Sequence, residues 1–202
     1  MPNQNIFPVS HRLLPRSERE SSLGYTGAVY WLCGLSGSGK STLAISLEKF
    51  LFENKINSIV LDGDDLRDGI CKDLGFSIED RKENVRRVSE IAKLMSRTGY
   101  AVIVSLISPT IEMRNFARKI IGEKDFFEIF IKSSFEKCQE RDVKGLYADS
   151  QNGKIKSFTG KDSIFEEPDS PWMVLDTENE KLQESTSKLC QAVLKQTTSL
   201  NS

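Results

Sequence analysis

Residues 28–42, AVYWLCGLSGSGKST, decide the fold. The segment AVYWLCG has the length and the β-branched and aromatic content of a buried strand. Gly34 to Ser41 match the pattern G-x-x-x-x-G-K-[ST], and residues 41–55 repeat apolar side chains at helical spacing. A strand, a glycine-rich loop and a helix in this order predict a phosphate-binding loop, because the glycines let backbone N–H groups turn inward and the helix presents its N-terminal amides to the same anion. The alternative is a turn that precedes a lysine by chance, and the flanking strand and helix disfavour it.

This loop predicts the residues that bind a nucleoside triphosphate. Lys40 is expected to reach the β- and γ-phosphates and to act in catalysis, and the Ser41 hydroxyl is expected to hold Mg²⁺. The other expected ATP-binding residues are Gly34, Leu35, Ser36, Gly37, Ser38, Gly39 and Thr42.

Strand-like and helical segments alternate along the rest of the chain. We expect strands at 56–62, 100–107, 125–131 and 172–177, and helices at 78–98, 110–121, 134–142 and 178–196. This order predicts an α/β protein with a three-layer, doubly wound and mainly parallel sheet. The polar stretch at about 142–171 is too long for an idle connection, and we interpret it as a mobile lid. We expect residues 1–24 to form an N-terminal arm and residues 25–202 to form one kinase domain.

Composition limits the classes of partner. The chain has 202 residues and a net charge of -1, so it has no general basic field to attract nucleic acid or anionic membranes. No apolar run is long enough to span a bilayer, and the cysteines at 33, 71, 138 and 190 are too far apart for a zinc site. We therefore expect reduced thiols, no nucleic-acid or membrane partner, and a cytoplasmic location.

An acidic turn, Asp62-Gly63-Asp64, ends the strand at 56–62. The apolar strand at 100–107 carries no aspartate, so this turn supplies the acids expected beside a phosphate loop. Two carboxylates suit a kinase, because one can order Mg²⁺ or its waters while the other orients or deprotonates the acceptor hydroxyl. An ordinary solvated acidic turn is the alternative.

Basic and aromatic residues suggest the acceptor side. Arg81 and Asn84 fall near one face of a helix, and Arg67 follows the acidic turn, so a guanidinium fork and an amide could meet an anion. On these residues alone, a charged and solvated helix face is the better interpretation. Phe76 and Phe158 stand in polar surroundings and suggest an aromatic clamp on a base, although the residues alone favour buried core positions for both.

Taken together, these segments resemble the adenylylsulfate kinases. The resemblance rests on GLSGSGKSTLA, LDGDDLRDGI, LGFSIEDRKENVRRVSEIAKL, VSLISP, RDVKGLY and IKSFTGKDSIFEEP, and it covers roughly residues 24–177 in unbroken order. Kinases of this family transfer the γ-phosphate of MgATP to the ribose 3′-hydroxyl of adenylyl sulfate. The products are 3′-phosphoadenylyl sulfate and ADP.

The resemblance implies a P-loop nucleotide kinase fold with a lid and a role for each matching residue. Asp62 and Asp64 would be catalytic residues in the region of the magnesium and the acceptor hydroxyl, and Ser41 and Asp62 would bind the metal. Asp64 would also contact adenylyl sulfate. The other residues expected to contact adenylyl sulfate are Arg67, Arg81 and Asn84 at its phosphosulfate and ribose, Phe76 and Phe158 at its adenine, Ile107 and Ser108 along its edge, and Lys144 from the lid.

Ser108 matches the serine described in the family as a phosphoserine intermediate. We interpret it instead as a hydroxyl that orders the acceptor, because direct in-line transfer between two bound substrates needs no covalent step. The resemblance also implies a homodimer and a functional link to a separate ATP sulfurylase. Two alternatives stay open: a P-loop kinase of another small hydroxyl acceptor, and a non-catalytic nucleotide-binding module.

Overall fold

The computed structural model describes residues 7, 9–142, 145, 147–148, 159 and 164–198. Their strands form one sheet in which every pair is parallel, and the strand order is β2-β3-β1-β4-β5. The strands are β1 (Ala28–Cys33), β2 (Ser58–Asp62), β3 (Ala101–Ser105), β4 (Phe126–Lys132) and β5 (Met173–Asp176). The expected doubly wound α/β sheet is confirmed, and it is parallel throughout rather than mainly parallel.

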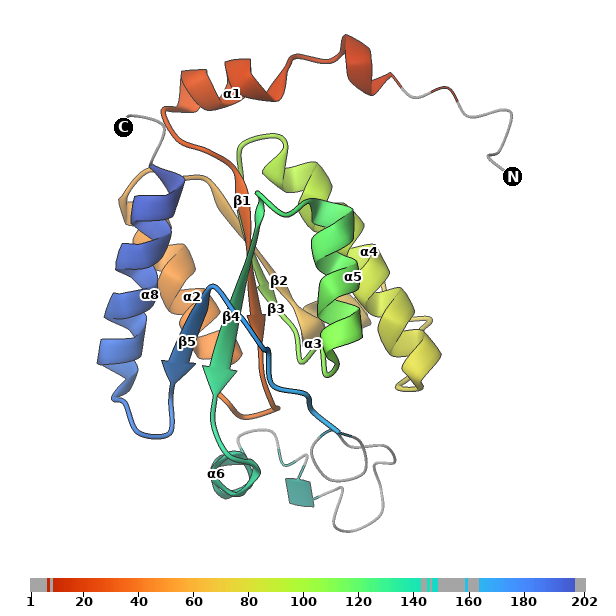
Figure 1. Ribbon diagram of the computed structural model, residues 1–202, viewed down its shortest axis with the longest axis vertical. Coiled ribbons are helices and arrows are strands. Elements are labelled where there is room, and N and C mark those ends of the chain that lie inside the picture. Colours follow the sequence, from red (N-terminus) through yellow and green to blue (C-terminus); the bar gives the residue numbers. More distant parts are fainter. Residues whose placement is uncertain are drawn as a thin grey trace.

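Helices cover both faces of the sheet and create three layers (Figure 1). One face is covered by α2 (Lys40–Glu53) and α8 (Leu182–Thr197), and the other by α4 (Ile78–Ser96) and α5 (Ile111–Ile121). Alternate residues of β1 enter the two cores, with Tyr30 on the α2 and α8 side and Trp31 on the other. This double burial explains why β1 and β3 are apolar along almost their whole length.

The sheet topology places the loops after β1 and β3 side by side. The helix that follows β1 (α2) packs on one face of the sheet and the helix that follows β3 (α5) packs on the other, so the two connections leave these neighbouring strands toward opposite faces. Ligands of open α/β sheets bind in the crevice at such a switch point. In the register, Ser105 pairs with both Leu32 and Asp62, so the strands that carry the glycine-rich loop and the acidic turn end at the same level.

The N-terminal segment contains helices that the sequence did not indicate. A 3₁₀ turn (Ser10–Arg12) precedes α1 (Arg16–Leu23), which lies across the amino ends of the strands (Figure 1). Arg16 donates to Asp125 at 2.9 Å, and Glu20 accepts a bond from the Gly27 N–H at 2.9 Å. These contacts tie α1 to the body of the protein. The division into an arm and a kinase domain stays a prediction.

The acidic turn is the start of a helix, α3 (Gly63–Asp68), and not an isolated turn. Asp62 is its N-cap, because the carboxylate accepts the Asp64 N–H at 3.0 Å. The last expected helix before the lid is α6 (Phe135–Arg141), and most of the expected lid lies outside the described residues. Within the described ranges, no helix is long and apolar enough to cross a membrane.

Candidate active site

A cavity of about 540 Å³ opens at the carboxyl ends of β1, β2 and β3. From the glycine-rich loop and the start of α2, it is lined by Ser36, Gly37, Gly39, Lys40, Ser41 and Thr42. Asp62 and Asp64 contribute from the acidic turn, and Ile107 and Ser108 from the segment after β3. One wall of the same cavity contains Arg67, Phe76, Arg81 and Asn84. The structure therefore brings four separate groups of predicted residues into one space.

Five of the predicted site residues are not found in the described lining of this cavity. Gly34, Leu35 and Ser38 belong to the loop but do not line the cavity: Leu35 packs with Cys138 and Tyr147, and Ser38 is fully buried. Lys144 and Phe158 lie outside the described residues. Their expected contacts with adenylyl sulfate stay predictions.

Two positions in the loop require glycine. Gly34 has a φ of +152°, and a Cβ there would lie 2.6 Å from the carbonyl oxygen of Ile131. Gly37 has a φ of +77°, and its Cβ would lie 3.0 Å from the carbonyl oxygen of Cys138. Any other residue at either position would be strained and would also push the loop away from its neighbours.

Side chains from other segments hold the carbonyl groups of the loop. Three of them donate to three successive carbonyls: Tyr147 to Ser36 at 2.8 Å, Arg141 to Gly37 at 3.3 Å and Thr177 to Ser38 at 2.7 Å. In a planar trans peptide, the C=O and the following N–H point in opposite directions. The N–H groups of Gly37 and Gly39 therefore point away from these side chains, as an anion-binding loop requires.

A hydroxyl and a carboxylate meet at the start of α2. Ser41 Oγ donates to Asp62 Oδ2 at 2.7 Å and lies 3.4 Å from Ser105 Oγ. Oxygen donors suit a hard divalent cation, and Mg²⁺ is commonly bound through one or two carboxylates together with substrate phosphates. In the part of the chain that the structure describes, no three His, Cys, Asp or Glu residues form a group that could hold a metal ion. The Ser41 and Asp62 oxygens fit a cation that binds together with a nucleotide.

Two arginines lie close to the ring of Phe76. The Arg67 guanidinium carbon is 4.3 Å from the ring centroid and that of Arg81 is 5.8 Å away. Burial lowers the pKa of both guanidinium groups, and the charge of Arg67 lowers that of Arg81 further. Two partly desolvated cations at such close range favour an anion beside them. Phe76 itself is 57% exposed, so the alternative of a buried core phenylalanine is wrong at this position.

Asn84 presents an unsatisfied acceptor to the cavity. The residue is 6% exposed, and its Oδ1 has no hydrogen-bond partner among the described residues. A buried acceptor without a partner costs about 1–3 kcal/mol. A ligand that donates a hydrogen bond here would remove that cost.

Ser108 has an unusual backbone conformation. Its φ is +45°, in the left-handed region that non-glycine residues seldom adopt, and the residue is 4% exposed. The Trp31 indole N–H donates to Ser108 Oγ at 3.0 Å, and Arg114 donates to the Ser108 carbonyl at 2.7 Å. The hydroxyl thus accepts from Trp31 and keeps its own hydrogen to donate elsewhere.

Sequence reasoning missed the residues that support this site from behind. Glu128 is a charged residue inside the otherwise apolar run at 126–131, which was a detectable signal. Arg114 was not marked in this way, because the helix at 110–121 also carries Glu112, Arg118 and Lys119. Trp31 and Thr177 gave no such signal, because their contacts with the site depend on how the strands are aligned.

Comparison with known proteins identifies the family. A family model described as adenylylsulphate kinase matches residues 26–176. The adenylyl-sulfate kinase of Phocaeicola vulgatus is 48% identical over 194 residues, which are 96% of this chain and 95% of that protein. The chain belongs to the adenylyl-sulfate kinase family.

Other members of the adenylyl-sulfate kinase family agree with this assignment. The adenylyl-sulfate kinase of Clostridium acetobutylicum is 52% identical over 164 residues, 81% of this chain and 82% of that protein. The APS kinase of Mycobacterium tuberculosis, solved in complex with AMPPNP and APS, is 42% identical and superposes with a TM-score of 0.80 over 84% of this chain and 98% of its own.

Membership of the adenylyl-sulfate kinase family makes the chain a phosphotransferase, and such kinases use a divalent cation with their nucleotide. Neither of the two alternatives, a kinase of another hydroxyl acceptor or a non-catalytic nucleotide-binding module, is favoured.

Proposed function

We propose that this chain transfers the γ-phosphate of MgATP to the 3′-hydroxyl of adenylyl sulfate, forming 3′-phosphoadenylyl sulfate and ADP. The observation that carries the proposal is the single cavity that joins the glycine-rich loop to the wall containing Arg67, Arg81 and Phe76. A phosphate donor and an anionic, aromatic acceptor can meet there without crossing the protein. Such proximity is the main requirement of phosphoryl transfer.

On the donor side, we propose that the loop N–H groups hold the β-phosphate and that Lys40 balances charge on the transferred group. Lys40 is 8% exposed, and its Nζ donates to the Leu35 carbonyl at 2.6 Å, so it already lies against the loop. Ser41 and Asp62 would hold Mg²⁺, which neutralises charge on the phosphates. Ser41 Oγ and Asp62 Oδ2 are 2.7 Å apart, which suits two ligands of one ion.

On the acceptor side, we propose that Arg67 and Arg81 grip the phosphosulfate. Their lowered pKa values mark a cost of burial that an anionic ligand would offset. Phe76 would stack on the adenine, and Asn84 Oδ1 would accept a hydrogen bond from the nucleotide. Ile107 and Ser108 would contact the same nucleotide from the segment after β3, and Lys144 and Phe158 would close over it from the lid.

Asp64 is the carboxylate that we assign to the acceptor hydroxyl. It lines the cavity in the first turn of α3, next to Asp62. As the 3′-oxygen bonds to the γ-phosphorus and the bond to ADP breaks, Asp64 would accept the hydroxyl proton. Ser108 would orient the acceptor through its own hydroxyl hydrogen and would not carry the phosphate. A homodimer, a functional link to a separate ATP sulfurylase and a cytoplasmic location also belong to this proposal.

The direct test is turnover by the purified protein with MgATP and adenylyl sulfate. We expect equal amounts of ADP and 3′-phosphoadenylyl sulfate, identified by mass spectrometry, with Lys40→Ala as the inactive control. Shikimate and gluconate serve as competing acceptors. Phosphorylation of either of these in preference to adenylyl sulfate would reject the proposed substrate.

A further inference from the structure

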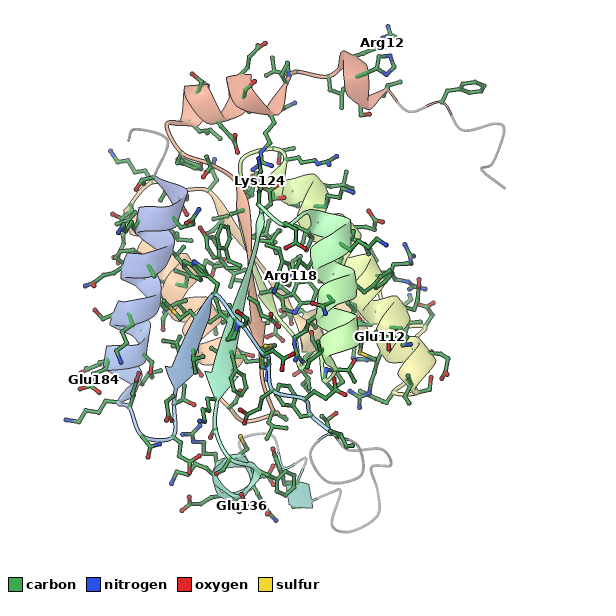
Figure 2. All side chains as sticks on the ribbon, viewed as in Figure 1. Arg12, Glu112, Arg118, Lys124, Glu136 and Glu184 are labelled. Carbon is green, nitrogen blue, oxygen red and sulfur yellow. The ribbon has the colours of Figure 1, made fainter. Side chains whose placement is uncertain are left out.

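A buried charged cluster lies directly behind Ser108. Arg114 of α5 and Glu128 of β4 form an ion pair with Nε and Oε1 2.7 Å apart, and their side chains are 1% and 6% exposed. Arg118, one turn later on α5, pairs with the other carboxylate oxygen at 2.8 Å and points from α5 toward β4 (Figure 2). Buried ion pairs often add little stability compared with apolar residues of similar volume, so stability alone is a weak reason for this pair.

Arg114 donates to two main-chain carbonyls in addition to pairing with Glu128. One belongs to Ser108, at 2.7 Å, and the other belongs to Glu166, at 2.6 Å. Ser108 lies in the segment after β3, whereas Glu166 lies in the segment that precedes β5. A planar guanidinium can donate to two carbonyls and at the same time lie in ion-pair contact with a carboxylate, which an ammonium group cannot do in the same geometry.

Glu166 makes further bonds to the segment after β3. Its backbone N–H donates to the Pro109 carbonyl at 2.8 Å, and its carboxylate accepts the Ile111 N–H at 2.7 Å. The segment after β3 and the segment at Glu166 are therefore joined by these two direct bonds as well as through Arg114. A displacement of one segment would also displace the other.

Ser108 needs such support because of its left-handed backbone. A non-glycine residue in this conformation costs roughly 1–2 kcal/mol, and it persists only where the surroundings hold it. Arg114 fixes the carbonyl of Ser108, and Trp31 fixes its hydroxyl oxygen. Together they determine which way Ser108 faces into the cavity.

We propose that Arg114, with Glu128 balancing its charge, is a positioning residue for the acceptor substrate. It holds the strained Ser108 and the segment at Glu166 in one fixed arrangement. The part of the cavity that Ser108 lines is therefore formed before adenylyl sulfate binds. This inference rests on the proposed function, because it takes Ser108 as a contact of adenylyl sulfate. Arg114 acts through Ser108 and does not itself touch the substrate.

The test compares Arg114→Met with Arg118→Met. Both variants remove an arginine of α5 that pairs with Glu128, but among the described residues Arg118 bonds to Glu128 and Glu123 and not to Ser108 or Glu166. Loss of charge-assisted bonds predicts that Arg114→Met raises KM for adenylyl sulfate about tenfold to hundredfold and leaves KM for ATP within about threefold. Arg118→Met should leave both values within about threefold. Arg114→Lys should fall between Arg114→Met and the parent protein.

A second readout does not depend on turnover. In a Trp172→Phe background, Trp31 is the remaining tryptophan, and its fluorescence reports on the bond to Ser108. We expect Arg114→Met to shift this emission and Arg118→Met to leave it unchanged. If the parent protein makes no product, the proposed function fails, while the fluorescence comparison still tests the position of Ser108.

Three results would overturn the inference: equal changes in the two KM values for Arg114→Met, equal effects of the two methionine variants, or unchanged Trp31 emission in Arg114→Met. If Arg114→Met does not fold, the double variant Arg114→Met/Glu128→Met replaces the whole pair by apolar side chains. It should fold and still show the selective loss for adenylyl sulfate. Normal kinetics in that variant would equally overturn the inference.

Discussion

Replacing Thr177 by valine removes one hydrogen bond from the outer side of the phosphate loop and keeps the shape of the side chain nearly unchanged. Thr177 Oγ1 donates to the Ser38 carbonyl at 2.7 Å. The hydroxyl is also 3.2 Å from the Lys132 carbonyl, but that carbonyl keeps the Thr177 backbone N–H at 3.0 Å. The hydroxyl also accepts a long bond of 3.5 Å from Arg141, whose same nitrogen keeps the Gly37 carbonyl at 3.3 Å. The group that loses its partner is therefore the Ser38 carbonyl.

The expected magnitude follows from that single loss. An acceptor left unsatisfied costs about 1–3 kcal/mol, and we take the lower part, about 1–1.5 kcal/mol, because Tyr147 and Arg141 still hold the neighbouring carbonyls. Without ATP, the loop can then leave its phosphate-binding conformation. ATP binding has to restore that conformation, which weakens the apparent affinity for ATP. Since about 1.4 kcal/mol corresponds to tenfold, KM for ATP should rise about five- to tenfold. The melting temperature should fall by roughly 2–6 °C, and KM for adenylyl sulfate should stay within about twofold.

Steady-state kinetics with each substrate varied in turn, together with thermal unfolding, measure these effects. The control is Thr198→Val, because Thr198 donates to the Leu194 carbonyl at 2.8 Å at the end of α8 and makes no recorded contact with the loop. An unchanged KM for ATP in a destabilised Thr177→Val protein would refute the claim that the outer bonds shape the loop. The same rise in KM in Thr198→Val would refute it as well.

The remaining predictions concern catalysis and pH. Lys40→Ala should lower kcat by at least about a hundredfold, because it removes the cation that we propose balances charge on the transferred phosphate; activity within tenfold would contradict this. Ser108→Ala should keep turnover within about tenfold, and complete loss with normal substrate binding, measured by calorimetry, would favour a covalent intermediate. Burial raises the pKa of Cys33 to about 12 and of Cys190 to about 11, from an ordinary value of 9.0. The folded protein then keeps protons that the unfolded chain releases, so the contribution of these thiols to the free energy of unfolding should be constant below about pH 9 and fall toward pH 12. Urea titrations should show a shallower decline in Cys190→Ala, and a flat profile in the parent protein would contradict the assigned burial.

The donor side of the site was predictable from the sequence because its requirements are local. Gly34 and Gly37 have no room for a side chain, and Lys40 and Ser41 follow at a spacing set by the start of a helix. The three-layer arrangement was predictable from local patterns as well, because a strand that is buried on both faces has a continuous apolar sequence. Each of these signals lies within a few residues of what it predicts.

The features that the sequence did not reveal depend on contacts between distant segments. Helix α1 is held by Arg16, which contacts Asp125 across 109 residues of sequence. Thr177 holds the phosphate loop across 139 residues, and no local pattern marks it. For Glu128, a charge within an apolar strand was visible, but its pairing with Arg114 became apparent only once α5 and β4 were packed together.

A structure with both nucleotides bound tests the central claim most directly. Crystals grown with AMPPNP and adenylyl sulfate should show the adenine of adenylyl sulfate against Phe76, its phosphosulfate within hydrogen-bond distance of Arg67 or Arg81, and its 3′-oxygen facing the γ-phosphate. Adenylyl sulfate bound elsewhere, or a 3′-oxygen turned away from the γ-phosphate with both ligands ordered, would contradict the account.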